Sequence, residues 1–513
     1  MSSTVVVTAV AAAAYFLIML AIGRASSRGT STSKESYFVA NRELRGFPLF
    51  AAVFGTNMTA FVMLGLAGQT YRIGLGTWGM LIGASVLTLP VHFYFGYRCW
   101  LVARRKKITS PVEFYRLRYD SNALGILAFV FMVAWTLPVV LTGIIGGGRV
   151  FNAVTDGAIP FWLGGLILVA VVAYYTVAGG MRATAWTNTV QTVLFLGFLL
   201  IAVIWVPAAS GGPVELFNQL NVEAPELISR NWDMAGFGPA LSWFILFSSG
   251  NFATPYIWIR MVSAQSGRSL RRMGTVYPIA VLATWGSAIL LGMWGAVLAP
   301  GLNEEESDSI VFILSSQLFP TGLVAVGLVG LLAIVMSSMD AQTLTISNLF
   351  TVDVVQRYRK HLDERSVVRY ARVFVLAMLA ILYVISLQPL PAVFDLATFA
   401  FTGFMTYFPM MVGGVLWRRA TKAGAVSSLV IGQVVALAGY FELYGHPFGL
   451  ETPFWVAIVS WGVFIVVSLF TAPPSDDVVE TFHGEWDRVW AQHPPAGRPL
   501  APGSEPAPAA EAP

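Results

Sequence analysis

The chain has 513 residues, of which 56 % are hydrophobic and only 11 % are charged, against about 25 % charged residues in soluble domains. With a mean hydropathy of +0.69, this composition excludes a soluble enzyme and indicates a polytopic membrane protein. The net charge of +4 comes from basic residues in short loops, which is typical of topology signals and not of nucleic-acid binding. A single cysteine, Cys99, excludes an internal disulfide framework.

Apolar runs of spanning length recur along the whole chain and predict about thirteen transmembrane helices. We place them at residues 4–23, 47–71, 76–102, 123–151, 160–178, 185–208, 238–262, 275–299, 320–352, 367–388, 391–417, 422–442 and 453–472. Following the spans in order puts five basic loops on one side, at residues 24–45, 104–107, 260–272, 357–372 and 418–422. By the positive-inside rule this side is cytoplasmic. We therefore expect a multi-pass protein of the cell membrane, with its N-terminus outside and its C-terminus in the cytoplasm.

Two short soluble pieces interrupt the spans, and a tail follows them. Residues 211–233 form a polar outer loop with room for a short helix, and residues 308–318 form a short amphipathic segment. We expect a transmembrane domain over residues 1–472 and a cytoplasmic, disordered tail over residues 473–513, which ends in a Pro/Ala/Gly/Glu-rich run. Many spans without a sizeable soluble domain favour a transporter over an enzyme.

The second and seventh spans carry helix breakers at mid-membrane. The second has Gly55, Asn57 and Thr59, and the seventh has Gly250 and Pro255. Because the two lie five spans apart, they predict a five-plus-five inverted repeat, with core repeats at about 47–208 and 238–417. An unwound segment frees backbone carbonyls for a cation and leaves half-helix N-termini for an anionic group.

The ninth span places hydroxyls and a carboxylate where a membrane helix is usually apolar: Ser337, Ser338 and Asp340. Polar groups at this depth are costly unless they face a cavity, a partner or an ion, although a lone Ser often bonds back to the preceding turn. Sodium is a hard cation that prefers oxygen ligands. We therefore predict a sodium site formed by these hydroxyls and by the carbonyls near Gly55 and Met58.

At this point the sequence resembles the sodium/solute symporter family, which includes proline, pantothenate, monocarboxylate, sialic acid and sugar symporters. The resemblance runs from Tyr37 to Trp417 and rests on four segments, residues 57–68, 175–191, 336–340 and 409–425. It implies a leucine-transporter-like fold, alternating access and Na⁺ as the coupling ion. The implied sodium ligands are the carbonyls of Gly55, Met58 and Ile334 and the hydroxyls of Ser337 and Ser338.

Two positions depart from the family pattern. Many members have Asp where this chain has Asn57 and Asn188. Because Asn supplies no negative charge, we predict one coupling sodium per cycle and not two. Asp340 lies less than a turn beyond Ser338, and two roles are open for it: ion coupling, or a hydrogen-bonded gate.

The substrate pocket is expected between the two broken spans and the third. Its candidate residues are polar side chains near the breaks: Asn57, Thr59, Gln69, Ser249, Asn251, Thr254 and Tyr256, with Trp135 and Phe404 as candidate gates. A substrate carboxylate would be held by helix N-termini and amides, which suits a small monocarboxylate, an amino acid or a neutral solute equally well. We expect the protein to act as a monomer. A sodium-independent facilitator or exchanger, or a transporter-like sensor, are the alternatives.

Overall fold

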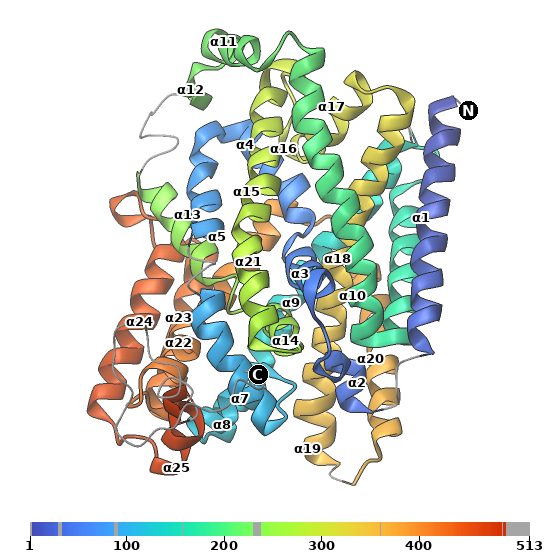
Figure 1. Cartoon of the computed structure of the whole chain (residues 1–513). Coiled ribbons are helices and arrows are strands. Elements are labelled where there is room, and N and C mark those ends of the chain that lie inside the picture. The colour runs from blue at the N-terminus through green and yellow to red at the C-terminus, as the bar shows by residue number, and fades with distance from the viewer. Residues whose placement is uncertain are drawn as a thin grey trace.

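The computed structural model describes residues 3–28, 33–86, 91–155, 157–228, 237–359, 361–484 and 486–488. In this part of the chain the fold is all-helical, and the only extended pairing is an isolated bridge between Leu44 and Ala264 (Figure 1). The all-helical fold class predicted from the sequence is confirmed for these residues.

Helices that form whole or partial spans account for most of the structure. They are α1 (Ser3–Ser27), α3 (Gly46–Asn57), α4 (Ala67–Ile73), α5 (Trp78–Val86), α7 (Tyr97–Lys106), α9 (Asn122–Val154), α10 (Phe161–Ala209), α13 (Phe237–Ser249), α14 (Pro255–Val262), α15 (Gly267–Leu298), α18 (Thr321–Phe350), α20 (Glu364–Ser386), α21 (Val393–Met405), α22 (Phe408–Leu416), α23 (Lys422–Tyr440) and α24 (Thr452–Phe470).

Short helices connect or cap these elements. They are α2 (Lys34–Val39), α8 (Pro111–Tyr119), α11 (Pro213–Glu223), α12 (Pro225–Ile228), α16 (Glu304–Ser307), α17 (Ile310–Leu318), α19 (Gln356–Tyr358) and α25 (Asp476–Val479). Single 3₁₀ or π turns occupy Ala40–Arg42, Phe61–Leu66, Gly74–Thr77, Val91–Gly96, Thr351–Val355, Pro447–Gly449 and Glu480–Gly484.

By length and composition, nine described helices can each cross a membrane, and ten if the bent pair that begins with α3 counts as one span. The exact count of thirteen is therefore not established by this test. This test counts α10 as one helix, whereas the sequence predicts two spans there. Its 49 residues would extend about 74 Å if straight, over twice the apolar thickness of a bilayer.

A glycine divides α10 into two. Gly180 has φ +52° and ψ −141°, a conformation that residues other than glycine rarely adopt. A Cβ at this position would also lie 2.5 Å from the carbonyl oxygen of Tyr37. The two halves of α10 correspond to the predicted spans 160–178 and 185–208.

Both predicted helix breaks are confirmed. Helix α3 ends at Asn57, Met58 is extended (φ −83°, ψ 92°), and helix resumes at Phe61 after a bend of 55°. In the second repeat α13 ends at Ser249 and α14 begins at Pro255, with Thr254 as its extended N-cap. Proline fits the first turn of α14 because the N–H groups there have no partner within the helix.

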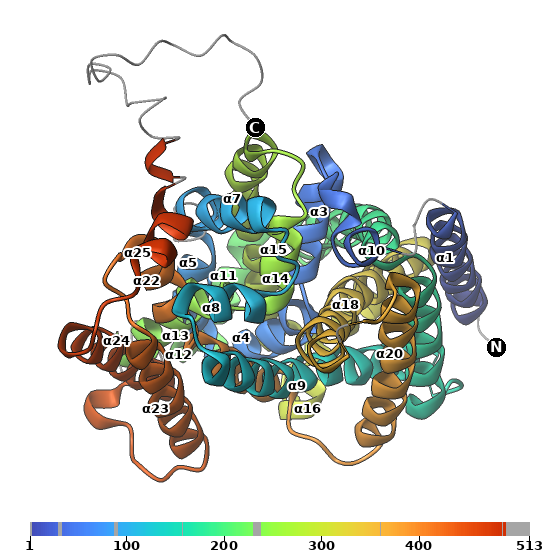
Figure 2. The same cartoon turned by 90° about the horizontal axis from the view of Figure 1, so that it is seen from below.

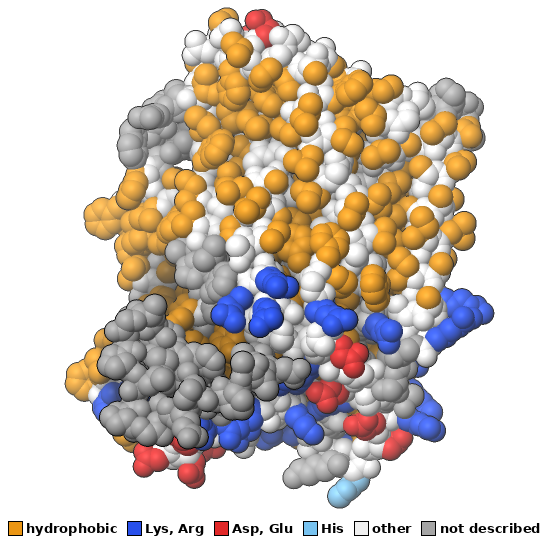
Figure 3. Space-filling model, in the orientation of Figure 1, with side chains coloured by type: hydrophobic (Ala, Val, Ile, Leu, Met, Phe, Trp, Pro, Cys, Tyr) orange, Lys and Arg blue, Asp and Glu red, His pale blue; other side chains and the backbone are white. Residues whose placement is uncertain are grey.

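Helix α18 lies inside the bundle. Nearly every residue from Val324 to Leu349 is buried, and α18 packs against α1, α3, α9, α10, α14 and α20. Seen from below, α1 lies at one edge of the molecule and α23 and α24 at the opposite edge (Figure 2). Lys and Arg side chains gather at the lower end, beneath a broad hydrophobic band (Figure 3). We call this lower end the basic end.

The two short soluble pieces and part of the tail are helical. Helices α11 and α12 fall within the predicted outer loop, and α17 matches the predicted segment 308–318. The expected disorder of the tail does not hold for its first part, because α25 and the turn Glu480–Gly484 are ordered and bury Phe482 and His483. Residues 489–513, which include the Pro-rich run, lie outside the described residues.

Candidate functional site

The polar side chains of α18 are removed from solvent. Ser337 and Asp340 are 0 % exposed, and Ser338 is 2 % exposed. Burying such groups without partners costs several kcal/mol each, on the order of 2–7 kcal/mol for a hydroxyl. The positions of their partners therefore define the site.

Ser337 joins α18 to the first helix break. Its Oγ lies 2.9 Å from the carbonyl oxygen of Gly55, 2.9 Å from that of Ile334 and 3.5 Å from that of Met58. A single hydroxyl proton can serve only one of these three acceptors at a time. The structure thus gathers three carbonyl oxygens and one hydroxyl oxygen around one point.

This oxygen cluster has the chemistry of a site for a hard monovalent cation. Its donors are neutral oxygens, which hard cations prefer. The carbonyls of Gly55 and Met58 lie at the C-terminal end of the half-helix α3, where the helix dipole favours positive charge. Backbone carbonyls there have no partner in the next helical turn, because the helix stops at Asn57.

Ser338 and two α10 residues lie around the same cluster. The Ser338 hydroxyl donates to the carbonyl of Val335 at 3.1 Å, which is the back-bonding arrangement that the sequence left open. Asn188 Nδ2 lies 3.5 Å from Thr56 Oγ1, and among the described residues neither Asn188 Oδ1 nor Thr192 Oγ1 has a hydrogen-bond donor. A Cβ on Gly55 would lie 3.0 Å from that Thr192 oxygen and 3.6 Å from Asn188 Cβ, so both side chains lie beside the end of α3.

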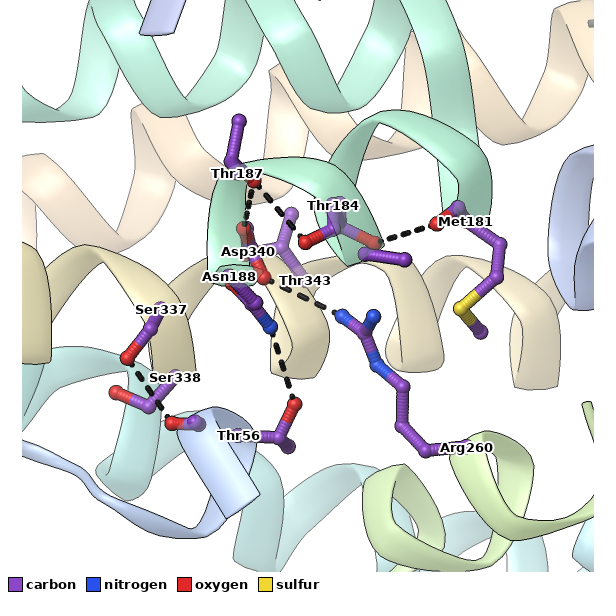
Figure 4. Close-up of polar contacts among 12 residues, drawn as sticks. Thr56, Met181, Thr184, Thr187, Asn188, Arg260, Ser337, Ser338, Asp340 and Thr343 are labelled. Atoms are coloured by element: carbon purple, nitrogen blue, oxygen red, sulfur yellow. Dashed lines mark hydrogen bonds and ion pairs between the residues drawn. The ribbon is translucent and has the colours of Figure 1, made fainter. Parts of the chain in front are cut away.

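Asp340, one turn beyond Ser337, forms a buried ion pair. Its Oδ1 lies 3.4 Å from Nη2 of Arg260, and its Oδ2 accepts a hydrogen bond from Thr187 Oγ1 at 3.2 Å (Figure 4). Both charged side chains are at most 1 % exposed. The sequence assigned Arg260 to a cytoplasmic loop, and this is wrong: it is a buried residue of α14. The loop therefore begins after α14.

Of the substrate candidates near the first break, two lie at the break and one does not. Asn57 is buried and donates from Nδ2 to the hydroxyl of Tyr277 on α15. Thr59 accepts the backbone N–H of Phe61 at 3.1 Å and so caps the second half-helix. Gln69 lies two turns further, where it accepts a hydrogen bond from Arg72, at the end of the molecule opposite the basic end.

The candidates in the second break are all buried. Ser249 bonds back to the carbonyl of Ile245 at 2.6 Å, and Thr254 donates to the carbonyl of Asn251 at 2.7 Å. The ring of Tyr256 meets Phe404 edge-on, with centroids 6.1 Å apart. Phe404 therefore lies beside the second break.

Trp135 packs on α21 at Gly403, next to Phe404, and a separate aromatic group surrounds Phe61. Trp135 Nε1 donates to Gln433 on α23, and its ring packs on Phe399. Phe61, where helix resumes after the first break, was not among the predicted site residues. Its ring packs against those of Phe247, Trp285, Phe394 and Phe401, with centroids 5.3–6.2 Å apart. An aromatic residue just beyond a helix break is the only signal that could have indicated it.

A second polar cluster lies at the end opposite the basic end. Arg149 pairs with Glu305 at 2.9 Å and with Asp308 at 3.2 Å, and Asp308 Oδ2 also lies 3.4 Å from the N–H of Val393 on α21. Burial raises the pKa of Asp308 to about 6, although Arg149 and Arg72 act to lower it. Asp308 thus links α9, the α16–α17 connection and α21.

Comparisons with known proteins identify relatives of this chain. The sequence profile of the "Sodium:solute symporter family" matches residues 37–432. The chain is 26 % identical to the osmoregulated proline transporter OpuE of Bacillus subtilis, over 90 % of this chain and 94 % of that protein. It is 25 % identical to the sodium/proline symporter of Escherichia coli, over 94 % and 96 % of the two chains.

Two solved structures share the fold. A Na⁺-coupled sialic acid symporter in a substrate-bound outward-open state matches with a TM-score of 0.75 at 18 % identity, covering 91 % of this chain and 99 % of that one. MhsT in complex with L-phenylalanine matches with a TM-score of 0.55 at 12 % identity, covering 83 % and 98 %.

Proposed function

The chain belongs to the sodium:solute symporter family, and from this premise we propose that it imports a small organic solute with sodium by alternating access. Relatives described as sodium/proline symporters make proline, or another small amino acid, the first substrate to test. A monocarboxylate is the second candidate. The protein is not an enzyme in this proposal, and a monomer in the cell membrane suffices for the cycle.

The sodium site of this proposal is formed by the carbonyls of Gly55, Met58 and Ile334 with the hydroxyls of Ser337 and Ser338. The observation that carries it is the position of Ser337 Oγ within 2.9–3.5 Å of all three carbonyls. Ser338 needs only a change of rotamer away from Val335 to contribute its hydroxyl. No carboxylate is among these ligands, so we expect a single, weakly held ion whose affinity depends on geometry.

Coupling follows from the way α18 holds both lower half-helices. Ser337 contacts α3 at Gly55, and Asp340, three residues later, pairs with Arg260 of α14. Bound sodium would tie α3 to α18, while the ion pair would keep α14 against the same helix. Loss of sodium would then release α3 alone and open a path at the basic end. In this role Asp340 is a gating residue and not a sodium ligand.

Sodium and substrate bind cooperatively in this scheme. Sodium fixes the end of α3, so it orders Asn57 and Thr59 beside the pocket, and each ligand raises the affinity of the other by the same factor. The N-terminus of α14, with its Thr254 cap, offers N–H groups to a substrate carboxylate. One sodium moving inward down a potential of 100 mV supplies about 2.3 kcal/mol, to which its concentration gradient adds.

We also propose that the basic end is cytoplasmic, which puts the start of α1 outside and α25 inside. The basic side chains below the hydrophobic band support this orientation (Figure 3). A sodium-independent facilitator on the same fold is the alternative function, and transport measurements separate the two.

Uptake into liposomes tests the proposal. Purified protein should accumulate radioactive proline, or another solute from a small panel, only when sodium is higher outside. An inside-negative potassium diffusion potential should increase the rate. Uptake of the transported solute that is indifferent to the sodium gradient would exclude symport in favour of the facilitator.

A further inference from the structure

A groove at the basic end lies apart from the sodium and substrate sites. It has a volume of about 800 Å³ and runs between the start of α3, the second half of α10 and the start of α15. These three helices pack against one another (Figure 1). Nothing in the transport cycle described above uses this groove.

Its polar side chains are strongly biased in charge. Three arginines line it, Arg45 before α3, Arg182 on α10 and Arg272 on α15, against one acidic residue, Glu43. All three arginine side chains are exposed. Among the residues that the structure describes, neither Arg45 nor Arg272 forms an ion pair. The groove thus offers converging positive charge from three separate elements.

Exposed apolar side chains form much of its remaining wall. Phe47 is 47 %, Trp186 48 % and Val276 50 % exposed, and all three line the groove. They lie within four residues of the three arginines along the chain. In Figure 3 the Lys and Arg side chains of this face follow the lower border of the hydrophobic band. Tryptophan and arginine are both favoured at such a boundary.

We propose that this groove binds an anionic phospholipid of the leaflet at the basic end. The phosphate and any further headgroup oxygens would accept hydrogen bonds from Arg45, Arg182 and Arg272, since guanidinium groups match phosphate geometry. The acyl chains would lie along Phe47, Trp186 and Val276. Basic pockets between transmembrane helices on the cytoplasmic side suit such headgroups. A soluble anion would use the three arginines but would leave the apolar wall without a function.

The position of the groove gives the lipid a structural effect. It joins the start of α3, whose other end carries Gly55, to α10 and α15. A ligand that bridges these three helices binds only when they are packed together, so it stabilises the folded protein by mass action.

The test uses the full-length purified protein in neutral detergent after delipidation. It is titrated with phosphatidylglycerol, with phosphatidylcholine of the same acyl chains, and with inorganic phosphate, while thermal stability and retained lipid are followed by fluorescence and native mass spectrometry. We expect saturable stabilisation by phosphatidylglycerol only. In Arg45→Gln/Arg272→Gln its apparent affinity should fall about 30-fold, since each surface arginine contributes a factor of about five toward anionic lipid.

The matched control is Arg268→Gln/Arg271→Gln. It removes the same charge from exposed residues in the first turns of α15 that do not line the groove. The control should bind phosphatidylglycerol as the unmodified protein does. Equal stabilisation by inorganic phosphate would instead assign the groove to a soluble anion and overturn the lipid proposal. Equal weakening in the control would reduce the effect to general surface charge, and equal binding of phosphatidylcholine would remove the role of charge; either result overturns the proposal.

Discussion

Replacing Ser337 by Ala removes one oxygen from the proposed sodium site and leaves the rest of the cluster in place. The hydroxyl lies 2.9 Å from the Gly55 carbonyl across the helix break and 2.9 Å from the Ile334 carbonyl in its own helix. A hydrogen-bonding group that acts on a charge contributes roughly 1.5–3 kcal/mol. The half-saturating sodium concentration of Ser337→Ala should therefore rise roughly 10- to 100-fold.

Sodium-dependent thermal stability measures this without knowledge of the substrate. Purified protein is titrated with sodium chloride against choline chloride at constant ionic strength, and the increase in Tm gives the half-saturating concentration. The sodium-induced increase in Tm is compared between variants, and not the Tm itself, because Ser337→Ala also loses about 1 kcal/mol of hydrogen bonding when no ion is present.

Ser347→Ala is the matched control. Ser347 is a buried serine of the same helix, and its Oγ donates to the carbonyl of Ala371 at 2.9 Å. It is ten residues from Ser337 along α18. The control should lose a similar amount of basal stability and keep the sodium response. The reasoning is refuted if Ser337→Ala keeps the half-saturating concentration of the unmodified protein, or if Ser347→Ala shifts it equally.

Three further predictions follow from the other polar contacts. Asp340→Asn leaves the buried Arg260 without its counter-charge and should cost about 3–5 kcal/mol of stability. Adding Arg260→Met to the same chain should restore most of this stability without restoring transport. Chemical denaturation measures the stability and uptake assays measure the transport, and restored transport would contradict the gating role. Asn57→Ala and Tyr277→Phe should be non-additive in substrate affinity because Asn57 donates to the Tyr277 hydroxyl, so additive losses in a double-mutant cycle would argue against that contact. Burial raises the pKa of Asp308 from 3.8 to about 6, so a conformation that buries Asp308 binds more protons than one that exposes it to water. Lowering the external pH from 7 to 5 should therefore favour the buried conformation by about 1 kcal/mol and slow uptake. The slowing should be absent in Asp308→Asn, and its persistence there would assign it to another group.

The sequence predicted those features that depend on short stretches of chain. Gly55 and Asn57 mark the first break and Pro255 the second, because glycine, proline and polar side chains at mid-membrane are incompatible with a regular apolar helix. The contact between Ser337 and Gly55, which are 282 residues apart, was predicted by combining the helix break in the second span with the polar stretch of the ninth, and the family resemblance added Ile334 to the ligands. Local chemistry alone does not reveal it.

Pairings set by tertiary packing could not be predicted in this way. Arg260 follows an apolar run and precedes further basic residues, so its sequence context is that of a loop, and only the packing of α14 against α18 buries it beside Asp340. Tyr277 is 220 residues from Asn57 in the chain, and no periodicity connects the two. Part of the tail is ordered because Phe482 finds a buried position, which its polar neighbours in the sequence do not indicate.

Equilibrium binding of radioactive sodium to the purified protein tests the central claim most directly. The account predicts saturable binding of one ion per chain, enhanced by the transported solute and lost in Ser337→Ala/Ser338→Ala, while Ser347→Ala binds normally. Saturable binding that persists unchanged in the double variant would contradict it.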